Sequence, residues 1–219
     1  MDFTISRLLE GAAVTLQVTA LTVLVGVPLS FAAGFARLAR SGWIRASATI
    51  YVEVFRGTSA LIQVFYLFYV LPLVGISLDA ITAGVLALAL NMGAYGSELV
   101  RSSLLAVDPG QREAAIALNM TRRNMIWRII VPQAIPMMLP PFGNLTIEIL
   151  KATSLLSLIT ITELSFAGRQ VVGSTGDLTG TYVLVLLLYF AMAYPLVVGV
   201  RYLERRVGRR ALPGTGVGI

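Results

Sequence analysis

Long apolar stretches dominate this chain of 219 residues and leave few folds open to it. Each stretch has about the length of a helix that crosses a bilayer. Because hydrocarbon offers no partner to backbone N–H and C=O groups, such segments must be helical. We therefore predict an all-α, multi-pass membrane protein that forms a single domain over 1–219. The expected transmembrane helices, about five in number, are residues 11–36, 58–73, 80–100, 135–161 and 181–200.

Composition excludes several classes of chemistry. With 13% charged and 57% hydrophobic residues, the chain has too few charges to cover a water-exposed surface. It contains no cysteine and no histidine, which removes disulfides, thiolate metal sites and catalysis by either side chain. We expect no metal and no cofactor. The net charge of +6 would suggest nucleic acid in a soluble protein, so the positions of the basic residues decide its meaning.

The basic residues gather on one side of the predicted membrane. If five spans alternate in direction, fourteen of the 17 basic residues lie on the same side. Positive side chains mark the cytoplasmic face, which places the N-terminus outside and the C-terminus in the cytoplasm. This distribution explains the positive charge without a nucleic-acid partner. The fourteen residues are Arg37, Arg40, Arg45, Arg56, Arg101, Arg112, Arg122, Arg123, Arg128, Arg201, Arg205, Arg206, Arg209 and Arg210.

Two sets of polar residues lie inside the first and third spans. In the first span, small and hydroxyl residues recur at steps of three and four, so that they share one helical face. Such a face lets a second helix approach closely, and we interpret it as a packing seam. In the third span, Asn91 and Tyr95 are four residues apart and either pack in the core or line a pore. The first-span seam consists of Thr15, Thr19, Thr22, Gly26 and Ser30.

The fourth span combines prolines with ionisable residues. Three prolines and a glycine within 136–143 predict a broken helix, and an unwound turn in mid-membrane would free backbone dipoles for a solute. Glu148 and Lys151 follow on one helical face, and ionisable groups inside a span are candidates for function. They either line a solute path, with Asn144 and Ser154, or form a neutralising structural pair. A hydrolytic dyad of Lys151 and Ser154 is a further alternative.

The segment between the third and fourth spans carries clear helix signals. Asp108 and Pro109 match an N-cap acid followed by a proline at the first helical position. Asn119 tolerates the left-handed conformation that ends many helices, and Thr121 can cap a second helix. This second helix would end before Pro132. The two helices either lie on anionic lipid or dock a cytoplasmic partner.

The same segment, residues 108–132, contains the spaced set Glu113, Ala114, Ala115, Asn119, Ile129 and Pro132. This pattern resembles the EAA loop of bacterial ABC importer permeases, in which glycine is usual at the position of Asn119. Further segments, Val54–Thr58 and Leu139–Asn144, resemble the subfamily for polar amino acids, which includes histidine, glutamine, glutamate, arginine and opine permeases. Leu145 and Ala152 replace two acidic residues that are common there, which makes the chain most similar to permeases for ectoine and hydroxyectoine.

The resemblance implies the type I ABC importer permease fold and a place in the bacterial cell (plasma or inner) membrane. A second permease chain, identical or different, would complete the solute path. A cytoplasmic ATP-binding subunit would receive the helix that begins near Glu113. An extracytoplasmic solute-binding protein would deliver a polar amino acid or a related zwitterion.

The chain itself contains no Gly-rich phosphate-binding loop of the GxxxxGK[ST] type. ATP hydrolysis would therefore belong to the partner, and the chain would be a transport subunit without enzymatic activity. Two other classes stay open from the residues alone. One is an intramembrane Ser–Lys enzyme, and the other is a membrane scaffold protein.

Overall fold

The computed structural model describes the backbone of residues 2–211 and the side chains of residues 4–203. All regular structure in this part of the chain is helical, which confirms the predicted all-α class. Long α-helices alternate with short π and 3₁₀ segments, labelled η. The elements are α1 (Asp2–Ala36), α2 (Gly42–Gly57), α3 (Ala60–Phe65), η1 (Tyr66–Val70), η2 (Leu71–Val74), α4 (Ala80–Ala106), α5 (Pro109–Ala117), α6 (Arg122–Met125), η3 (Ile126–Ile130), α7 (Val131–Ala152), η4 (Thr153–Ile159), α8 (Leu164–Thr175) and α9 (Leu178–Ala211).

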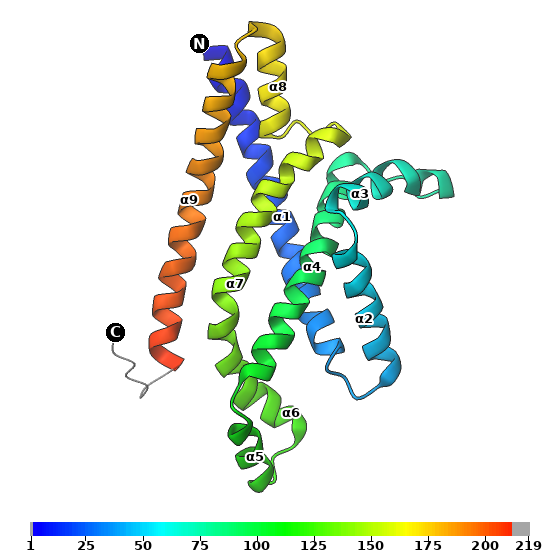
Figure 1. The fold of residues 1–219 in the computed structure, drawn as a ribbon, viewed down its shortest axis with the longest axis vertical. Coiled ribbons are helices and arrows are strands. Elements are labelled where there is room, and N and C mark those ends of the chain that lie inside the picture. Colours follow the sequence, from blue (N-terminus) through cyan, green and yellow to red (C-terminus); the bar gives the residue numbers. More distant parts are fainter. Residues whose placement is uncertain (1, 212–219) are drawn as a thin grey trace.

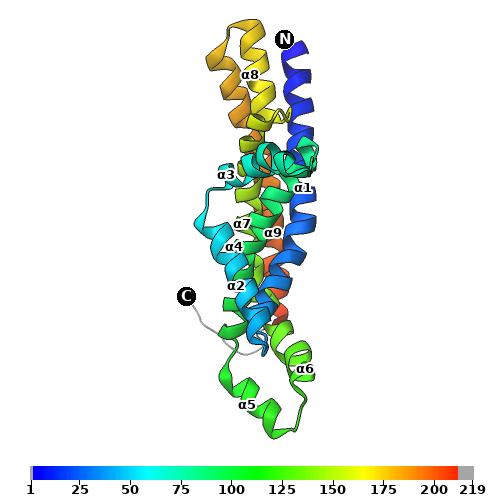
Figure 2. The same cartoon turned by 90° about the vertical axis from the view of Figure 1, so that its right-hand side faces the viewer.

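The longest helices run lengthwise through an elongated molecule (Figure 1). The N-terminus and α8 lie at one end, and α5, α6 and the corner between α1 and α2 lie at the other (Figure 1). Seen from the side, the molecule is narrow (Figure 2). Within the described residues, four helices are long and apolar enough to cross a membrane, and a bent helix pair makes a fifth candidate. The expectation of about five spans is confirmed.

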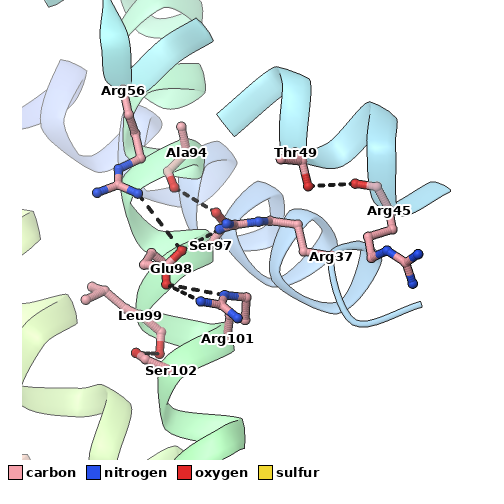
Figure 3. Close-up of polar contacts among 10 residues, drawn as sticks. All are labelled: Arg37, Arg45, Thr49, Arg56, Ala94, Ser97, Glu98, Leu99, Arg101 and Ser102. Atoms are coloured by element: carbon pink, nitrogen blue, oxygen red, sulfur yellow. Dashed lines mark hydrogen bonds and ion pairs between the residues drawn. The ribbon is translucent and has the colours of Figure 1, made fainter. Parts of the chain in front are cut away.

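The second span differs from the predicted one. The sequence suggested a single helix over 58–73, whereas α2 already begins at Gly42 and bends by 106° into the segment Ala60–Val74. Arg45 and Arg56 therefore belong to a helix and not to a loop after the first span. Arg56 lies at the end of α2, beside the middle of α4, as its neighbours in Figure 3 show.

A polar side chain stabilises this bend. The Gln63 amide donates hydrogen bonds to Phe55 O and to Thr58 Oγ1, both at 2.8 Å. The carbonyls at the C-terminal end of a helix have no partner within the helix, and inside a membrane they cannot turn to water. Gln63, which is 8% exposed, supplies the missing donor. The sequence analysis did not single out Gln63.

The predicted break in the fourth span between 136 and 143 is wrong. α7 is continuous from Val131 to Ala152, although it contains three prolines. A proline ring clashes with the carbonyl four residues earlier, and the π segment η3 directly before α7 widens the helix where Pro132 enters it. Packing against α4 on one side and α9 on the other offsets the hydrogen bonds that the prolines remove. Ala134 and Met138 cluster with residues of α4, and Gly143 lies against Val200 of α9.

The α-helix ends about two and a half turns after Gly143, at Ala152. Residues Thr153–Ile159 form a 3₁₀ segment, and Thr160 follows with a φ of 66°. The hydroxyls of Thr153 and Ser154 donate to the carbonyls three residues before them, at 2.6 and 2.8 Å. Such local bonds compete with the α-helical pattern and account for the tighter turn.

The polar face of the first helix is a packing seam, as predicted: Thr15 meets the start of α8, and Gly26 and Ser30 meet α4. All five seam residues are buried. Glycines on α1 and α4 interlock: a methyl group on Gly26 would lie 2.8 Å from Met92 Sδ, and one on Gly93 would lie 2.9 Å from Leu29 Cβ. Ser30 Oγ donates to Gly26 O at 2.7 Å and lies 3.3 Å from Met92 O across the interface. The interpretation as a packing seam is confirmed.

Candidate functional site

The loop between α4 and α7 begins with the predicted helix. Asp108 caps α5, because its Oδ1 accepts a hydrogen bond from Gly110 N at 2.8 Å. The helix ends at Ala117, and Asn119 follows in the left-handed region with a φ of 57°. Met120 N donates back to Ala115 O at 3.0 Å, the bond that closes a helix end of this kind. The predicted bend at Asn119 is confirmed.

The second helix of the loop starts as predicted but continues further. Thr121 Oγ1 accepts from Asn124 N at 3.3 Å and caps α6. The expectation that this helix ends before Pro132 is wrong, since α6, η3 and α7 follow one another without a gap. The wider π segment leaves room for the ring of Pro132, so this proline does not end the helix. The loop is thus connected rigidly to α7.

Exposure divides the residues that resemble the EAA loop into two groups. Ala115 is 1% exposed and packs inward, whereas Glu113 and Ala114 are exposed. Ile129 is half-buried and Pro132 is exposed. The predicted coupling residues therefore do not share one face.

Two apolar side chains protrude from the end of α5. Ile116 is 67% exposed and Leu118 is 76% exposed. Together with Glu113 and Ala117 they form an exposed surface that we call the loop tip. Exposed apolar residues with an adjacent charge are typical of a protein interface. The sequence analysis named the helix but not these two side chains.

Arginines and a buried cluster join the loop to the helices above it. Arg112 donates to Leu104 O in α4 at 2.7 Å, and Arg122 donates to Leu38 O beyond α1 at 3.2 Å. Behind them, an apolar cluster connects the ends of α4 and α7. Its members are Val100, Leu104, Val107, Ile130, Val131, Ala134 and Met138. A force on the loop tip is therefore transmitted to both helices.

Glu98 in α4 lies among three arginines (Figure 3). Its Oε2 binds Arg37 of the α1 end and lies 3.9 Å from Arg56 Nη1, and its Oε1 lies 2.9 Å from Arg101 Nη2. The guanidinium carbon of Arg56 also lies 5.5 Å from the ring centroid of Tyr95. This group, which we call the Glu98 cluster, joins α1, α2 and α4.

The sequence analysis missed the Glu98 cluster. An available signal was a carboxylate inside the third predicted span, three residues before Arg101, because an ionisable residue within a span marks a site of interest. The contribution of Arg37 and Arg56 could not be found in this way, since the two residues come from other helices.

Three predicted path residues share one exposed face of α7. Asn144, Glu148 and Lys151 follow at steps of four and three, and all are exposed. Lys151 is the only lysine of the chain. Within the described residues, neither Glu148 nor Lys151 makes an ion pair, although they are three residues apart. Ser154 is half-buried and its hydroxyl donates to the Lys151 carbonyl rather than to the amine.

The other two predicted path residues have different environments. The Asn91 amide donates to Gln63 Oε1 at 3.1 Å and lies 3.4 Å from Phe55 O, so it supports the bend between α2 and α3. Tyr95 is 41% exposed and stays open beside Arg56. Asn91 therefore does not belong to the polar face of α7, and the charged neighbour of Tyr95 is Arg56.

At the end of the molecule that carries α8, a buried carboxylate connects α8 with α9. Glu163, which is 0% exposed, caps α8 by accepting from Ser165 N and Phe166 N, each at 2.8 Å. Tyr189 of α9 donates to the same carboxylate at 2.9 Å. At this end, hydrogen bonds from Thr82 hold the pKa of Asp79 below its usual range, so Asp79 stays ionised as the cap of α4.

Among the side chains that the structure describes, no three Asp or Glu residues gather closely enough to hold a metal ion. The described residues offer an exposed loop tip, a charged cluster between helices and a polar face on a long apolar helix.

Comparison with known proteins defines the class. A family model described as "Binding-protein-dependent transport system inner membrane component" matches residues 26–209. The chain belongs to this family, and it is a multi-pass protein of the inner membrane.

Named relatives identify the particular kind of permease. The probable amino-acid ABC transporter permease protein y4tF of Sinorhizobium fredii is 45% identical over 206 residues, which cover 91% of this chain and 87% of the relative. The glutamine transport system permease protein GlnP of Escherichia coli is 35% identical over 206 residues, 93% of this chain and 94% of GlnP. The octopine transport system permease protein OccM of Rhizobium radiobacter is 35% identical over 221 residues, 94% of this chain and 90% of OccM. The chain is thus an amino-acid ABC transporter permease subunit, a transport protein and not an enzyme.

Solved structures agree with this assignment. A crystal structure of an amino acid ABC transporter with histidines matches with a TM-score of 0.89 and 33% identity, covering 94% of this chain and 96% of that one. An inward-facing structure of the MetNI methionine ABC transporter shares the fold, with a TM-score of 0.78 and 19% identity over 94% of this chain and 99% of that one. The predicted type I ABC importer permease fold is confirmed.

Proposed function

We propose that this chain forms part of the solute path of an ATP-driven importer for a polar amino acid or a related zwitterion. The observation that carries the proposal is the exposed face of Asn144, Glu148 and Lys151 on a membrane helix. Charged groups on such a helix are costly in lipid, so they face a water-filled path or another protein. A zwitterion carries the complementary charges for a carboxylate and an ammonium one helical turn apart.

The partners of this importer follow from its surfaces. We expect a cytoplasmic ATP-binding subunit to dock on the loop tip, with Glu113, Ala114, Asn119, Ile129 and Pro132 forming or supporting the contact. A second permease chain, identical or different, would cover the polar face of α7. An extracytoplasmic solute-binding protein would meet the end that carries α8. The long apolar surface of α9 would face membrane lipid, since little of this helix is buried.

The names of the relatives support amino acids and opines as the solute class. Octopine, glutamine and cystine transport are named among them. Ectoine and hydroxyectoine are compact zwitterions that the same pair of charges would bind, and we keep them as the narrower hypothesis. Binding assays of the cognate solute-binding protein with these compounds and with polar amino acids distinguish the two.

Removing the charge of Lys151 or Glu148 is expected to impair uptake. Lys151→Gln and Glu148→Gln should each lower the initial rate of solute uptake by about tenfold, the effect of about 1.4 kcal/mol in a rate-limiting interaction. Lys151→Arg keeps the charge and should recover part of the rate. The measurement is uptake of radiolabelled solute by cells or proteoliposomes with equal amounts of permease in the membrane.

Two control variants make this experiment specific. Glu10→Gln carries the same change near the N-terminal end of α1, where the carboxylate pairs with the exposed Arg7, and should leave uptake unchanged. Ser154→Ala should also retain uptake, whereas an intramembrane Ser–Lys enzyme would lose its activity. Normal uptake by both Lys151→Gln and Glu148→Gln would overturn the proposed path.

We also propose that the end with α8 faces outward and the loop tip faces the cytoplasm. Arg112, Arg122, Arg123 and Arg128 all lie in or near the loop, which supports this direction through the positive-inside rule. The side chains of Arg205, Arg206, Arg209 and Arg210 lie outside the described part and do not enter this argument.

Labelling of single cysteines tests the orientation, since the chain has no cysteine of its own. Gly173→Cys on α8 and Asn124→Cys on α6, outside the loop tip, are both exposed positions. A maleimide that cannot cross the inner membrane should label Gly173→Cys in intact cells about tenfold more than Asn124→Cys, because the bilayer core excludes charged reagents. Permeabilised cells should show equal labelling, and the reverse preference in intact cells would contradict the orientation.

A further inference from the structure

A cavity of about 310 Å³ lies where the loop meets the spans. Its walls come from the end of α1, the end of α4, and from α5, α6 and η3. We call it the loop-root cavity. It lies on the membrane side of α5, away from the exposed side chains of the loop tip.

The loop-root cavity is positively charged. Arg40, Arg112 and Arg122 line it, and no acidic residue does. Arg112 and Arg122 are oriented by helix-end carbonyls, to which each donates one hydrogen bond. A guanidinium has five N–H donors, so most of them stay free for a ligand. Arg40 makes no hydrogen bond or ion pair with any residue that the structure describes.

The rest of the wall is apolar. Phe35, Leu104 and Ile126 are representative of it. A purely ionic ligand would gain nothing from these side chains, whereas an amphiphile would place its charged group on the arginines and its carbon atoms on the apolar wall. The volume corresponds to about ten water molecules at about 30 Å³ each. This is room for a phosphate diester with its glycerol, and the acyl chains would leave through the open side.

We propose that the loop-root cavity binds the phosphate headgroup of an anionic phospholipid from the cytoplasmic leaflet. Arginine forks match phosphate oxygens, and anionic headgroups concentrate at this face of the membrane. The proposal rests on the proposed orientation, which puts the cavity at the cytoplasmic surface. A bound headgroup would lie between α1, α4 and α6, and would hold the loop in position against the spans.

Tryptophan fluorescence offers a direct test in the purified full chain. The Trp127 ring lies against Phe35, a cavity wall residue, with 5.6 Å between the ring centroids. The second tryptophan, Trp43, is 89% exposed, and Trp43→Phe leaves Trp127 as the single reporter. In a neutral detergent, dioctanoyl-phosphatidylglycerol should change the emission saturably, whereas dioctanoyl-phosphatidylcholine and inorganic phosphate should not at the same concentration.

Two double variants of equal charge separate a site from general attraction. Arg40→Gln with Arg122→Gln should weaken phosphatidylglycerol binding by about tenfold. Arg123→Gln with Arg128→Gln removes the same charge from exposed positions outside the cavity and should weaken it by less than about threefold, since screened surface charges act weakly. Arg40→Gln alone, which breaks no contact in the described structure, should also weaken binding and excludes a folding defect as the cause.

Each alternative result overturns the proposal. Equal losses in the two double variants would show nonspecific attraction. Equal binding of phosphatidylcholine would show that the charge plays no part, and equal binding of inorganic phosphate would assign the cavity to a free anion. Lipid binding is measured without solute or ATP. Its outcome therefore does not depend on the outcome of the uptake experiments.

Discussion

Glu98→Gln is expected to lower the free energy of unfolding by about 2–3 kcal/mol. Removing one partner of a buried ion pair costs about 3–5 kcal/mol, because the remaining charge is left unpaired in a poor solvent. The exposed fractions of the side chains here are 12% for Arg37 and 28% for Glu98, so water compensates part of that cost. Glutamine keeps the shape and one acceptor oxygen, but its NH2 group places a donor against an arginine, so the loss includes a hydrogen bond as well as the charge. Reversible unfolding of the purified protein in detergent measures it.

A comparison of variants shows whether the arginines cause this effect. Glu53→Gln on the exposed surface of α2 should change the stability by less than about 0.5 kcal/mol. In the Glu98→Gln background, Arg37→Gln should cost less than in the native protein, because it then relieves repulsion. Additive effects of the two changes would contradict the role of the Glu98 cluster in joining α1, α2 and α4.

The second large effect is expected at the loop tip. Ile116→Asp combined with Leu118→Asp should abolish co-purification of the ATP-binding subunit and should stop solute uptake. An interface residue that is fully covered by its partner contributes about 2 kcal/mol or more, which corresponds to about thirtyfold in affinity for one residue. Both side chains are mostly exposed in the chain by itself, so the permease should still fold and insert into the membrane.

Ala106→Asp is the matched control, since Ala106 is exposed at the end of α4 but lies outside the loop tip. It should leave the amount of captured ATP-binding subunit unchanged. Retained capture by the double variant would refute the docking surface at the loop tip. Ala115→Asp is unsuitable for this purpose, because Ala115 is buried and the change would disturb folding first.

Sequence reasoning succeeded where the cause of the structure is local. The cap at Asp108, the left-handed residue Asn119 and the cap at Thr121 each depend on a few adjacent residues, and all three are present. The seam on α1 also followed from spacing alone, since helical periodicity determines which side chains share a face. The positions of the spans followed from apolar length in most cases.

The errors concern features that depend on distant contacts. The prolines of α7 predict a break by their local chemistry, but packing against α4 and α9 keeps the helix intact. The bend after Gly57 becomes stable through Gln63 and Asn91, and the second of these comes from another helix. The arginines around Glu98 are separated from it in sequence by up to 61 residues. Helical spacing predicts only which residues of one helix share a face, so it cannot predict these contacts between helices.

The interlocked glycines of α1 and α4 restrict how this permease changes shape. Because each helix inserts side chains into the hollows of the other, the two cannot slide past one another without losing their contact. We therefore expect the two helices to move as one rigid body when the permease changes conformation. Bending would then fall at an interruption outside this pair, as at Thr160–Glu163 between η4 and α8. The open side would alternate by rotation of the other helices about the α1–α4 pair.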